Sequence, residues 1–449
     1  MVGLVHRGVD IRIGCRRLLV LDAFGGERVT GYVSTRGEGP VSFADAVLRG
    51  IPSDGGLFVP VSAPSFEWPP PHEATASWAA SDVICDLDSH RMRRIGQESC
   101  DFPFPLVEID PGIYVLELFH GPTHAFKDVG ARFMAGVVAE LVAMSGPAVT
   151  ILVATSGDTG GAVANAFFGR PGTKVVALFP LEGVSDRQRR QMTTLGSNIY
   201  AVGVEGTFDD CQGMVKACFA DTALAARHGL TSANSINVAR LLPQTIYYLD
   251  AARRFERAVH FVVPSGNLGN LCAGLIAARG GMPHAGFTAA FNENHRVADY
   301  LGGESFQPGP SVRTASNAMD VGNPSNLERI RHLYNFDDDA LRAEVRGTWV
   351  SDRETVSTIG DVYRRSGYVM DPHTAVAYAA AARHHGSDSP VVVLSTAHPA
   401  KFPEVVEDAI GGPVPIPPSI HAARQKEEML SVIGPRIQEL HVLLDGSGR

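Results

Sequence analysis

Short apolar runs alternate with longer helical stretches over most of the chain beyond residue 101. Four of these runs, each bounded by turn residues, are Val149 to Ala154, Val175 to Phe179, Phe261 to Pro264 and Val391 to Ser395. A run that is continuously apolar, and not alternating, is typical of a strand buried on both faces. The pattern therefore predicts an α/β protein whose parallel sheets are covered by helices.

Several stretches of the chain have the periodicity of a helix, three of them directly after polar or glycine-rich segments and one near each end of the chain. The predicted helices cover Phe43 to Leu48, Val129 to Met144, Gly160 to Phe168, Leu268 to Arg279 and, as a peripheral helix, Arg424 through Leu444. At 449 residues the chain exceeds the size of a single hydrophobic core, so we expect two or more packed units.

Composition excludes several classes of protein. The net charge is -9 and no dense run of basic residues occurs apart from Arg91 to Arg94 and Arg187 to Arg190, so we expect no nucleic acid partner. No apolar stretch reaches the roughly 18 residues that span a bilayer, so we expect no membrane segment. The six cysteines form no CxxC pair, which predicts reduced thiols in the cytoplasm, no disulfide framework and no metal site.

The run HGPTHAFKD contains the most informative residue, Lys127. Burial beside Phe126 and Ala125 would disfavour the ammonium form and leave a nucleophilic amine, which can hold an aldehyde cofactor. In isolation the run is compatible with a surface lysine whose stem lies on apolar neighbours.

Two glycine-rich loops connect apolar runs to helices. Ser265 to Asn270 (SGNLGN) can aim backbone N–H groups at an anion, although a plain strand-to-helix turn is the alternative. It lacks the GxGxxG spacing of a dinucleotide fold and the GK[ST] ending of a nucleoside triphosphatase. In the second loop, Thr155 to Thr159 (TSGDT), hydroxyls and amides suit a carboxylate or phosphate, and Asp158 is alternatively an N-cap.

Two further polar clusters add candidate ligands. Arg240, close to Asn234 and Ser235, can clamp a phosphate or carboxylate, although a lone arginine on a helix is usually solvated or ion-paired. Thr396 and Lys401 follow a buried strand, where a hydroxyl is well placed to meet a ligand in the crevice. We interpret His373 and His120 as hydrogen-bonded structural histidines.

Together these motifs resemble those of the threonine synthase family, pyridoxal-phosphate enzymes of fold type II related to the tryptophan synthase β chain. The match runs in order from YVSTRG at Tyr32 through DGGLFVP, FHGPTHAFKDVGARFMA, ATSGDTGGAVA, NSINVAR, PSGNLGN and DPHTAV to STAHPAKF, ending at Phe402. The resemblance implies a large cofactor-binding domain and a smaller one. We place the large domain at residues 106–130 and 226–410 and the small domain at 131–225, with an extension of unknown role at 1–29, an N-terminal region at 30–105 and a C-terminal helical tail at 411–449.

The resemblance also implies roles for individual residues. Lys127 would bind pyridoxal 5'-phosphate covalently and shuttle protons at the substrate carbons. The cofactor phosphate would be held by Gly266, Asn267, Leu268, Gly269 and Asn270, and Thr396 would face the pyridine nitrogen. Thr155, Ser156, Asp158 and Thr159 would meet the substrate carboxylate and the cofactor face, with Asp158 counted among the cofactor-binding residues. Asn234, Ser235 and Arg240 would grip the substrate phosphate, and Lys401 would assist.

The implied activity is that of a lyase in threonine biosynthesis, which converts O-phospho-L-homoserine and water to L-threonine and phosphate. His124, Val238 and Leu268 depart from the family pattern next to its motifs, so an enzyme acting on a related phosphorylated or phosphonate amino acid is the alternative. A binding protein that has lost catalysis is disfavoured because Lys127 is present with the whole phosphate loop. We expect a cytoplasmic monomer or homodimer.

Overall fold

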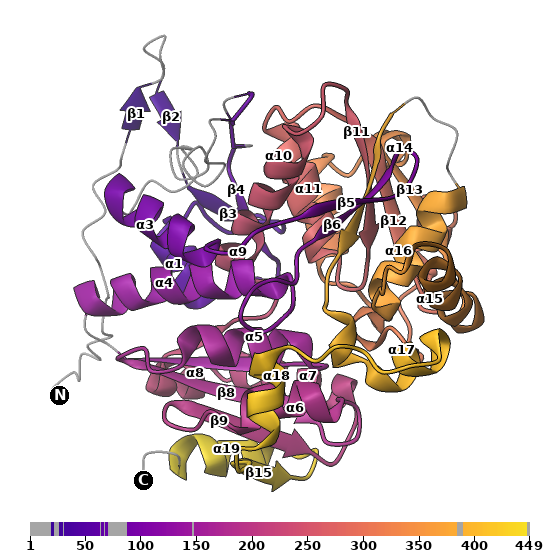
Figure 1. Ribbon diagram of the computed structural model, residues 1–449. Helices are drawn as coiled ribbons and strands as arrows, with labels where there is room; N and C mark the ends of the chain where they lie inside the picture. The colour runs from indigo at the N-terminus through magenta and orange to yellow at the C-terminus, as the bar shows by residue number, and fades with distance from the viewer. Residues whose placement is uncertain are drawn as a thin grey trace, which may run out of the picture.

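Two sheets organise the computed structural model, which describes residues 19–21, 27–29, 31–62, 64–66, 68–70, 88–145, 148–383 and 389–446 (Figure 1). The larger sheet has the strand order β13-β12-β11-β14-β6-β5. Its strands are β5 (Leu106–Asp110), β6 (Ile113–Glu117), β11 (Val259–Pro264), β12 (His284–Phe291), β13 (Val345–Trp349) and β14 (Val391–Ser395). Neighbouring strands are parallel except β5 and β6, which are antiparallel.

The smaller sheet is parallel throughout, in the order β10-β7-β8-β9-β15. Its strands are β7 (Val149–Ala154), β8 (Thr173–Pro180), β9 (Ile199–Val204), β10 (Leu230–Ser232) and β15 (Leu430–Ile433). Two short antiparallel pairs precede both sheets: β1 (Leu19–Leu21) with β2 (Glu27–Val29), and β3 (Tyr32–Ser34) with β4 (Phe58–Pro60). The rest of the predicted extension at 1–29 lies outside the described residues.

Helices cover both sheets, and α4 runs between them in Figure 1. The first half of the chain contains α1 (Phe43–Arg49), α3 (Ser89–Ser99), α4 (Lys127–Ser145), α5 (Asp158–Phe167), α6 (Asp186–Thr193), α7 (Phe208–Ala220) and α8 (Thr222–His228). The middle contains α9 (Val238–Leu241), η1 (Leu242–Gln244), α10 (Thr245–Ala252), α11 (Gly269–Arg279), α12 (Arg296–Leu301), η2 (Asn317–Met319), α13 (Asn326–Leu333) and α14 (Asp338–Glu344). The last part contains α15 (Asp352–Ser366), α16 (Pro372–Arg383), η3 (Pro399–Lys401), α17 (Pro403–Ile410), α18 (Pro418–Arg424) and α19 (Ile437–Gly446).

The predicted α/β class and the four predicted strands are confirmed. β7 and β14 have the predicted bounds, β11 begins two residues earlier, and β8 begins two residues earlier and ends one residue later. The apolar residues of these strands are buried on both faces, in cores that each sheet forms with the helices packed on it. The helices predicted at α1, α4, α5 and α11 are also present.

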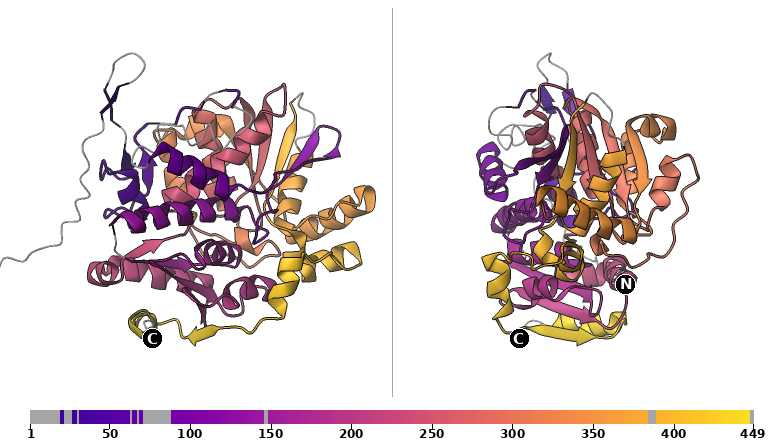
Figure 2. Two further views of the ribbon diagram at one scale, coloured as in Figure 1. Left: turned by 60° about the vertical axis from the view of Figure 1, so that its left-hand side comes forward. Right: turned by 45° about the vertical axis from the view of Figure 1, so that its right-hand side comes forward.

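The single helix predicted from Arg424 through Leu444 is wrong. Residues Leu430–Ile433 instead form β15, which pairs with β9 at an edge of the smaller sheet, and α19 begins only at Ile437. The run LSVI offers β-branched side chains to that edge, and Gly434 and Pro435 then prevent a continuous helix. Figure 2 shows this C-terminal segment, in yellow, along the outside of the smaller sheet.

The smaller sheet also extends beyond the range 131–225 that was predicted for the small domain. β10 and β15 lie outside that range, yet they are its edge strands. The division into domains otherwise stays a prediction. None of the described helices is long and apolar enough to cross a membrane.

Candidate active site

The carboxyl ends of β7, β11 and β14 and the start of α4 converge on a cavity of about 110 Å³. This is where ligands bind in parallel α/β sheets. The predicted site residues that line it are Lys127, Thr155, Ser156, Thr159, Ser235, Arg240, Gly266, Asn267, Leu268, Gly269, Asn270 and Thr396. The structure therefore brings together motifs from distant parts of the chain.

Asp158, Asn234 and Lys401 are not among the lining residues. Asn234 Nδ2 donates to Ala154 O at 2.8 Å, which ties its loop to the end of β7. The Lys401 side chain is completely buried and does not line the cavity, whereas a ligand of the substrate phosphate was expected to line it. Asn234 and Asp158 contact lining residues, and Lys401 is connected to the lining through Asp158.

Lys127 is the first residue of α4, and its side chain is 16% exposed. Burial lowers the pKa of its amine, as the sequence predicts, and the nearby charge of Lys401 acts in the same direction. Asp158 opposes this effect, with its Oδ2 3.7 Å from Lys127 Nζ. At that separation the lysine is attracted to the carboxylate without a short hydrogen bond.

Asp158 is the most constrained carboxylate at the site. Its Oδ1 accepts from Lys401 Nζ at 2.6 Å and from Gln188 Nε2 at 2.9 Å. Burial opposes ionisation of Asp158, but the charges of Lys401 and Lys127 outweigh it and hold the pKa of this carboxyl well below its usual value. It is the first residue of α5, and Gly157 is the helix N-cap, so Asp158 is not the side-chain cap considered from the sequence.

The loop that precedes Asp158 is closed by Thr155 and requires glycine. Thr155 Oγ1 accepts from the N–H groups of Gly157 at 2.9 Å and Gly160 at 2.8 Å. Gly157 has a φ of 130°, and an added Cβ would lie 2.5 Å from Gln188 Cδ. The glycine thus lets Gln188 approach closely enough to bind Asp158.

The second loop, Ser265 to Asn270, connects β11 to α11 and is held from outside by amide groups. Leu268 adopts a left-handed conformation with a φ of 61° just before α11 begins. Asn267 Nδ2 donates to Ser235 Oγ at 2.7 Å, and its Oδ1 accepts from Ser325 N at 2.6 Å. An added Cβ on Gly266 would lie 2.9 Å from Met319 Cα, so this position has no room for a side chain.

Asn270 presents an unpaired donor at the same end of the cavity. Its Oδ1 accepts from the hydroxyls of Tyr247 at 2.7 Å and Tyr248 at 2.9 Å. Its Nδ2 is buried and has no hydrogen-bond partner among the described residues. Since a buried unpaired amide is costly, this donor and the helix N-terminus fit an anionic ligand such as a phosphate.

Arg240 offers a second buried donor to the cavity. The residue is 2% exposed, its guanidinium donates to Ala233 O, and its Nε has no partner among the described residues. Burial lowers the pKa of Arg240 to about 10, and Asp128 opposes the shift. A buried guanidinium that lines a cavity beside Ser235 is suited to a phosphate or carboxylate.

His373 and Thr396 complete the lining on the β14 side. His373 Nδ1 donates to Asp371 at 2.7 Å, and Nε2 accepts from Ala318 N at 3.2 Å. This imidazole is therefore hydrogen-bonded through both ring nitrogens, as the structural interpretation of the sequence predicts. Thr396 is 6% exposed, and its carbonyl accepts from Phe126 N at 2.9 Å, next to Lys127.

Of the three departures from the family pattern, Leu268 lines the cavity whereas His124 and Val238 do not. His124 instead bonds Ser419 Oγ through Nε2 at 2.6 Å. Burial, with Lys401 nearby, lowers the pKa of His124 to about 4. Val238 is fully buried in the hydrophobic core, so its effect on a ligand is indirect.

Arg329 and Gln188 support the site but were not singled out from the sequence. The completely buried guanidinium of Arg329 donates to the carbonyls of Ile236 at 2.7 Å and Phe58 at 3.0 Å, which fixes the loop that carries Ser235. Gln188 lies within the basic cluster Arg187 to Arg190 that composition had flagged only as a charge run. No local sequence pattern distinguishes either residue from a solvent-exposed residue on an ordinary surface helix.

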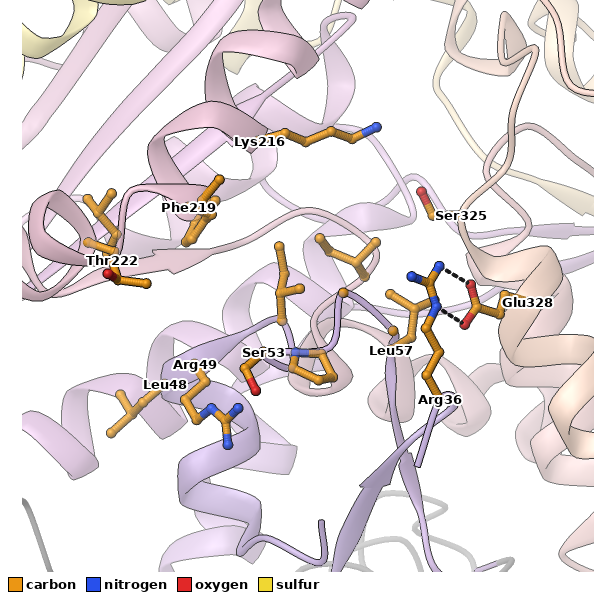
Figure 3. Close-up of a pocket in the computed structure, with 18 of the residues that line it drawn as sticks. Arg36, Leu48, Arg49, Ser53, Leu57, Lys216, Phe219, Thr222, Ser325 and Glu328 are labelled. Atoms are coloured by element: carbon orange, nitrogen blue, oxygen red, sulfur yellow. Dashed lines mark hydrogen bonds and ion pairs between the residues drawn. The ribbon is translucent and has the colours of Figure 1, made fainter. Parts of the chain in front are cut away.

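A groove of about 1680 Å³ lies near the loop from Ser265 to Asn270 (Figure 3). Arg36 pairs with Glu328 at one end of it, and Lys216 and Phe219 lie on the opposite wall. Ser325 lines this groove and also donates its N–H to Asn267. The groove and the cavity therefore share a wall.

Three family models match the chain. The model of pyridoxal-phosphate dependent enzymes covers residues 102–397, the threonine synthase N terminus covers 31–80, and the threonine synthase C-terminal region covers 374–442. The threonine synthase of Serratia marcescens is 40% identical over 87% of this chain and 93% of its own length. That of Escherichia coli is 39% identical over 84% of this chain and 90% of its own.

Solved structures agree with these relatives. The pyridoxal-phosphate-bound threonine synthase from Brucella melitensis has a TM-score of 0.87 and 35% identity, covering 94% of this chain and all of its own. The threonine synthase from Escherichia coli has a TM-score of 0.88 and 35% identity, covering 93% of this chain and 99% of its own. The chain belongs to the threonine synthase family of pyridoxal-phosphate-dependent enzymes of fold type II.

Proposed function

We propose that this enzyme converts O-phospho-L-homoserine and water to L-threonine and phosphate. The observation that carries the proposal is the presence of two anion-binding positions in one cavity. The unpaired Asn270 Nδ2 at the start of α11 marks one, and the unpaired Arg240 Nε marks the other. A phosphorylated cofactor and a phosphorylated substrate need two such positions.

The loop from Gly266 to Asn270 suits the phosphate of pyridoxal phosphate, because Gly266 allows close approach of a ligand and Asn270 offers an unused donor. Lys127 provides the amine for covalent attachment, and Thr396 provides the hydroxyl assigned to the pyridine nitrogen. The cofactor supplies an electron sink for charge that develops at the substrate carbons.

The remaining chemistry belongs to residues of this chain. Lys127, as a free amine, takes the proton from Cα and then from Cβ and returns protons later, because its lowered pKa favours the neutral form. Arg240, Ser235 and, through their loop, Asn234 hold the substrate phosphate and offset the charge on it as it leaves.

The loop from Thr155 to Thr159 is assigned to the substrate carboxylate. Thr155, Ser156 and Thr159 line the cavity at the start of α5, where backbone N–H groups and hydroxyls favour an anion. Asp158 lies beneath this surface with its Oδ2 3.7 Å from Lys127 Nζ, which supports a role at the cofactor and not at the carboxylate.

Incubation of the purified enzyme with O-phospho-L-homoserine, with threonine and phosphate followed together, tests the proposal. Equal molar release of both products is expected. Turnover of a related phosphorylated or phosphonate amino acid with only trace activity on phosphohomoserine would favour the alternative substrate, for which Leu268 in the cavity lining is the relevant departure.

We also propose that the enzyme acts in the cytoplasm as a monomer or homodimer, with no nucleic acid partner. The net charge of -9 supports the last of these points, the absence of a nucleic acid partner.

A further inference from the structure

Lys401 is a buried cation that is bound on the side away from the substrate cavity. Its side chain is 0% exposed at the end of η3, and its Nζ lies 2.6 Å from Asp158 Oδ1 and donates to Thr123 O at 3.0 Å. A buried ammonium is costly unless such partners compensate for lost water. These two bonds direct the charge towards Asp158, so the predicted role as a substrate-phosphate ligand does not account for its position.

Asp158 thus lies between two lysines and binds them unequally. Its Oδ1 accepts from Lys401 at 2.6 Å and from Gln188 at 2.9 Å, whereas Oδ2 is 3.7 Å from Lys127 Nζ. The short bonds fix the carboxylate, and the longer separation leaves Lys127 free to react. The single negative charge of Asp158 therefore interacts with both lysines, and it lies closer to Lys401 than to Lys127.

The turn that carries Lys401 is also fixed from the side of the smaller sheet. Ser185 Oγ donates to Lys401 O at 3.2 Å, and the guanidinium of Arg187 donates to Ala400 O. Both donors lie at the start of α6, the helix that carries Gln188. The backbone and the side chain of Lys401 are therefore held independently of any substrate.

We infer that Lys401 is a positioning residue that neutralises Asp158 and fixes its orientation, so that Asp158 can orient Lys127 without retaining a proton on its amine. The inference rests on the proposed role of Lys127 as the cofactor-binding lysine. Without Lys401, Asp158 would be a buried carboxylate with Lys127 as its remaining cationic partner, and it would hold positive charge on that nitrogen.

Other ionisable groups around the pair do not replace Lys401. His373 acts on Asp158 only through space, and its two ring nitrogens bond Asp371 and the Ala318 N–H. Burial lowers the pKa of His124 and of His398 to about 4, so both imidazoles are uncharged near neutral pH. Arg240 and Asp128 act on Lys127 and Lys401 only through space, without a bond to Asp158 among the described residues.

The test is a pH titration of the visible absorption of the bound cofactor, whose midpoint reports protonation of the nitrogen that joins it to Lys127. Lys401→Met should raise this midpoint by about one pH unit or more, because an unbalanced carboxylate favours the protonated form. Lys401→Arg should restore the midpoint to within a few tenths of a unit. Lys216→Met, which removes an exposed charge at the groove (Figure 3), is the matched control and should leave it unchanged.

Asp158→Asn provides a second variant, should Lys401→Met fail to fold, and it should lower the midpoint. In the Asp158→Asn background, Lys401→Met should lose most of its effect, because Lys401 acts through the carboxylate. An unchanged midpoint in Lys401→Met would overturn the inference, and a raised KM for phosphohomoserine in that variant would assign Lys401 to the substrate phosphate. An unchanged or raised midpoint in Asp158→Asn would also overturn the inference. A wild-type enzyme that titrates normally but forms no threonine would refute the proposed function alone.

Discussion

The two ends of the cavity handle charge by opposite means. At one end Lys127 lines the cavity, and behind it the buried Asp158 pairs with both Lys127 and Lys401. At the other end the loop from Gly266 to Asn270 offers backbone amides and the Asn270 carboxamide, none of which titrates. Groups that exchange protons must be tunable by burial and neighbouring charge. A permanent anion is held better by donors whose state does not change with pH.

The largest effect should come from the charged end. Lys127→Ala removes both the covalent attachment and the base, so kcat should fall by about 10⁴-fold or more. The visible absorption of the bound cofactor should be lost at the same time, as a spectrum of the reconstituted variant will show. Lys216→Ala is the control, and a Lys127→Ala variant that retained both band and activity would contradict the assignment.

Arg240 lies between the two ends and combines a permanent charge with deep burial. Arg240→Met should lower kcat/KM for phosphohomoserine by about 10²- to 10³-fold, since a buried charge pair would lose one partner. Arg240→Lys should recover only part of this loss, because an ammonium lacks the planar fork. Steady-state kinetics measures this loss, and inhibition by inorganic phosphate should weaken in parallel. A general loss of stability would instead leave the phosphate inhibition constant unchanged.

The neutral end was the easier part to predict from the sequence. A glycine-rich loop after a continuous apolar strand specifies much of its own geometry, and Gly266 occupies a position that has no room for a side chain. The burial of Lys127 was also predictable, since it lies in a run whose neighbours are apolar, whereas its role as the cofactor lysine stays a prediction that rests on the resemblance. In both cases the information is local.

The charged end was less predictable because its pairs join residues far apart in the chain. Lys401 contacts Asp158 only because η3 after β14 packs against α5 and α6. Arg329 and Gln188 follow the same rule, as their partners are backbone carbonyls and a carboxylate brought close by folding. The strand β15 was missed for a related reason: a helical period near the terminus was outweighed by pairing to β9.

Asp128 and Asp158 offer a comparison within the charged end. Both are buried, but Asp128 accepts hydrogen bonds from Thr123 and has no lysine bonded to it in the part of the chain that the structure describes, and burial raises its pKa to about 6. Its folded pKa exceeds the unfolded value, so its contribution to stability is complete below about pH 4 and is lost as the pH rises towards 6. Asp158 shifts in the opposite direction because lysines compensate it.

Asp128→Asn should therefore remove part of the pH dependence of stability. Between pH 4 and pH 6.5, the unfolding free energy of the wild type should fall relative to the variant by at most about 3 kcal/mol. Urea unfolding at several pH values measures this difference. A gap that stays constant across the range would show that Asp128 is ionised throughout and that its burial is compensated.

At the neutral end, Gly266→Ala should weaken cofactor binding about 10- to 100-fold. An added Cβ would lie 2.9 Å from Met319 Cα and 3.0 Å from Ala318 O, and displacing backbone costs roughly 1–3 kcal/mol. Gly213→Ala in α7, where an added Cβ meets nothing within 4 Å, is the matched control. Equilibrium titration of the apoenzyme with cofactor gives both dissociation constants, and equal values would show that the loop is not the phosphate site.

The smallest effect should come from the hydroxyls that orient Asn270. Tyr247 donates to Asn270 Oδ1 at 2.7 Å, and Tyr248 supplies a second hydrogen bond, so the amide is held with Nδ2 as its free donor. Tyr247→Phe removes one of two restraints and should weaken cofactor binding by about 1 kcal/mol, or roughly fivefold. The loss should be the same from pH 6 to pH 9, because no group at this end changes its protonation over that range. A loss that grew with pH would mean that the neutral end is coupled to the charged one, and the two ends would then have to be treated as a single electrostatic unit.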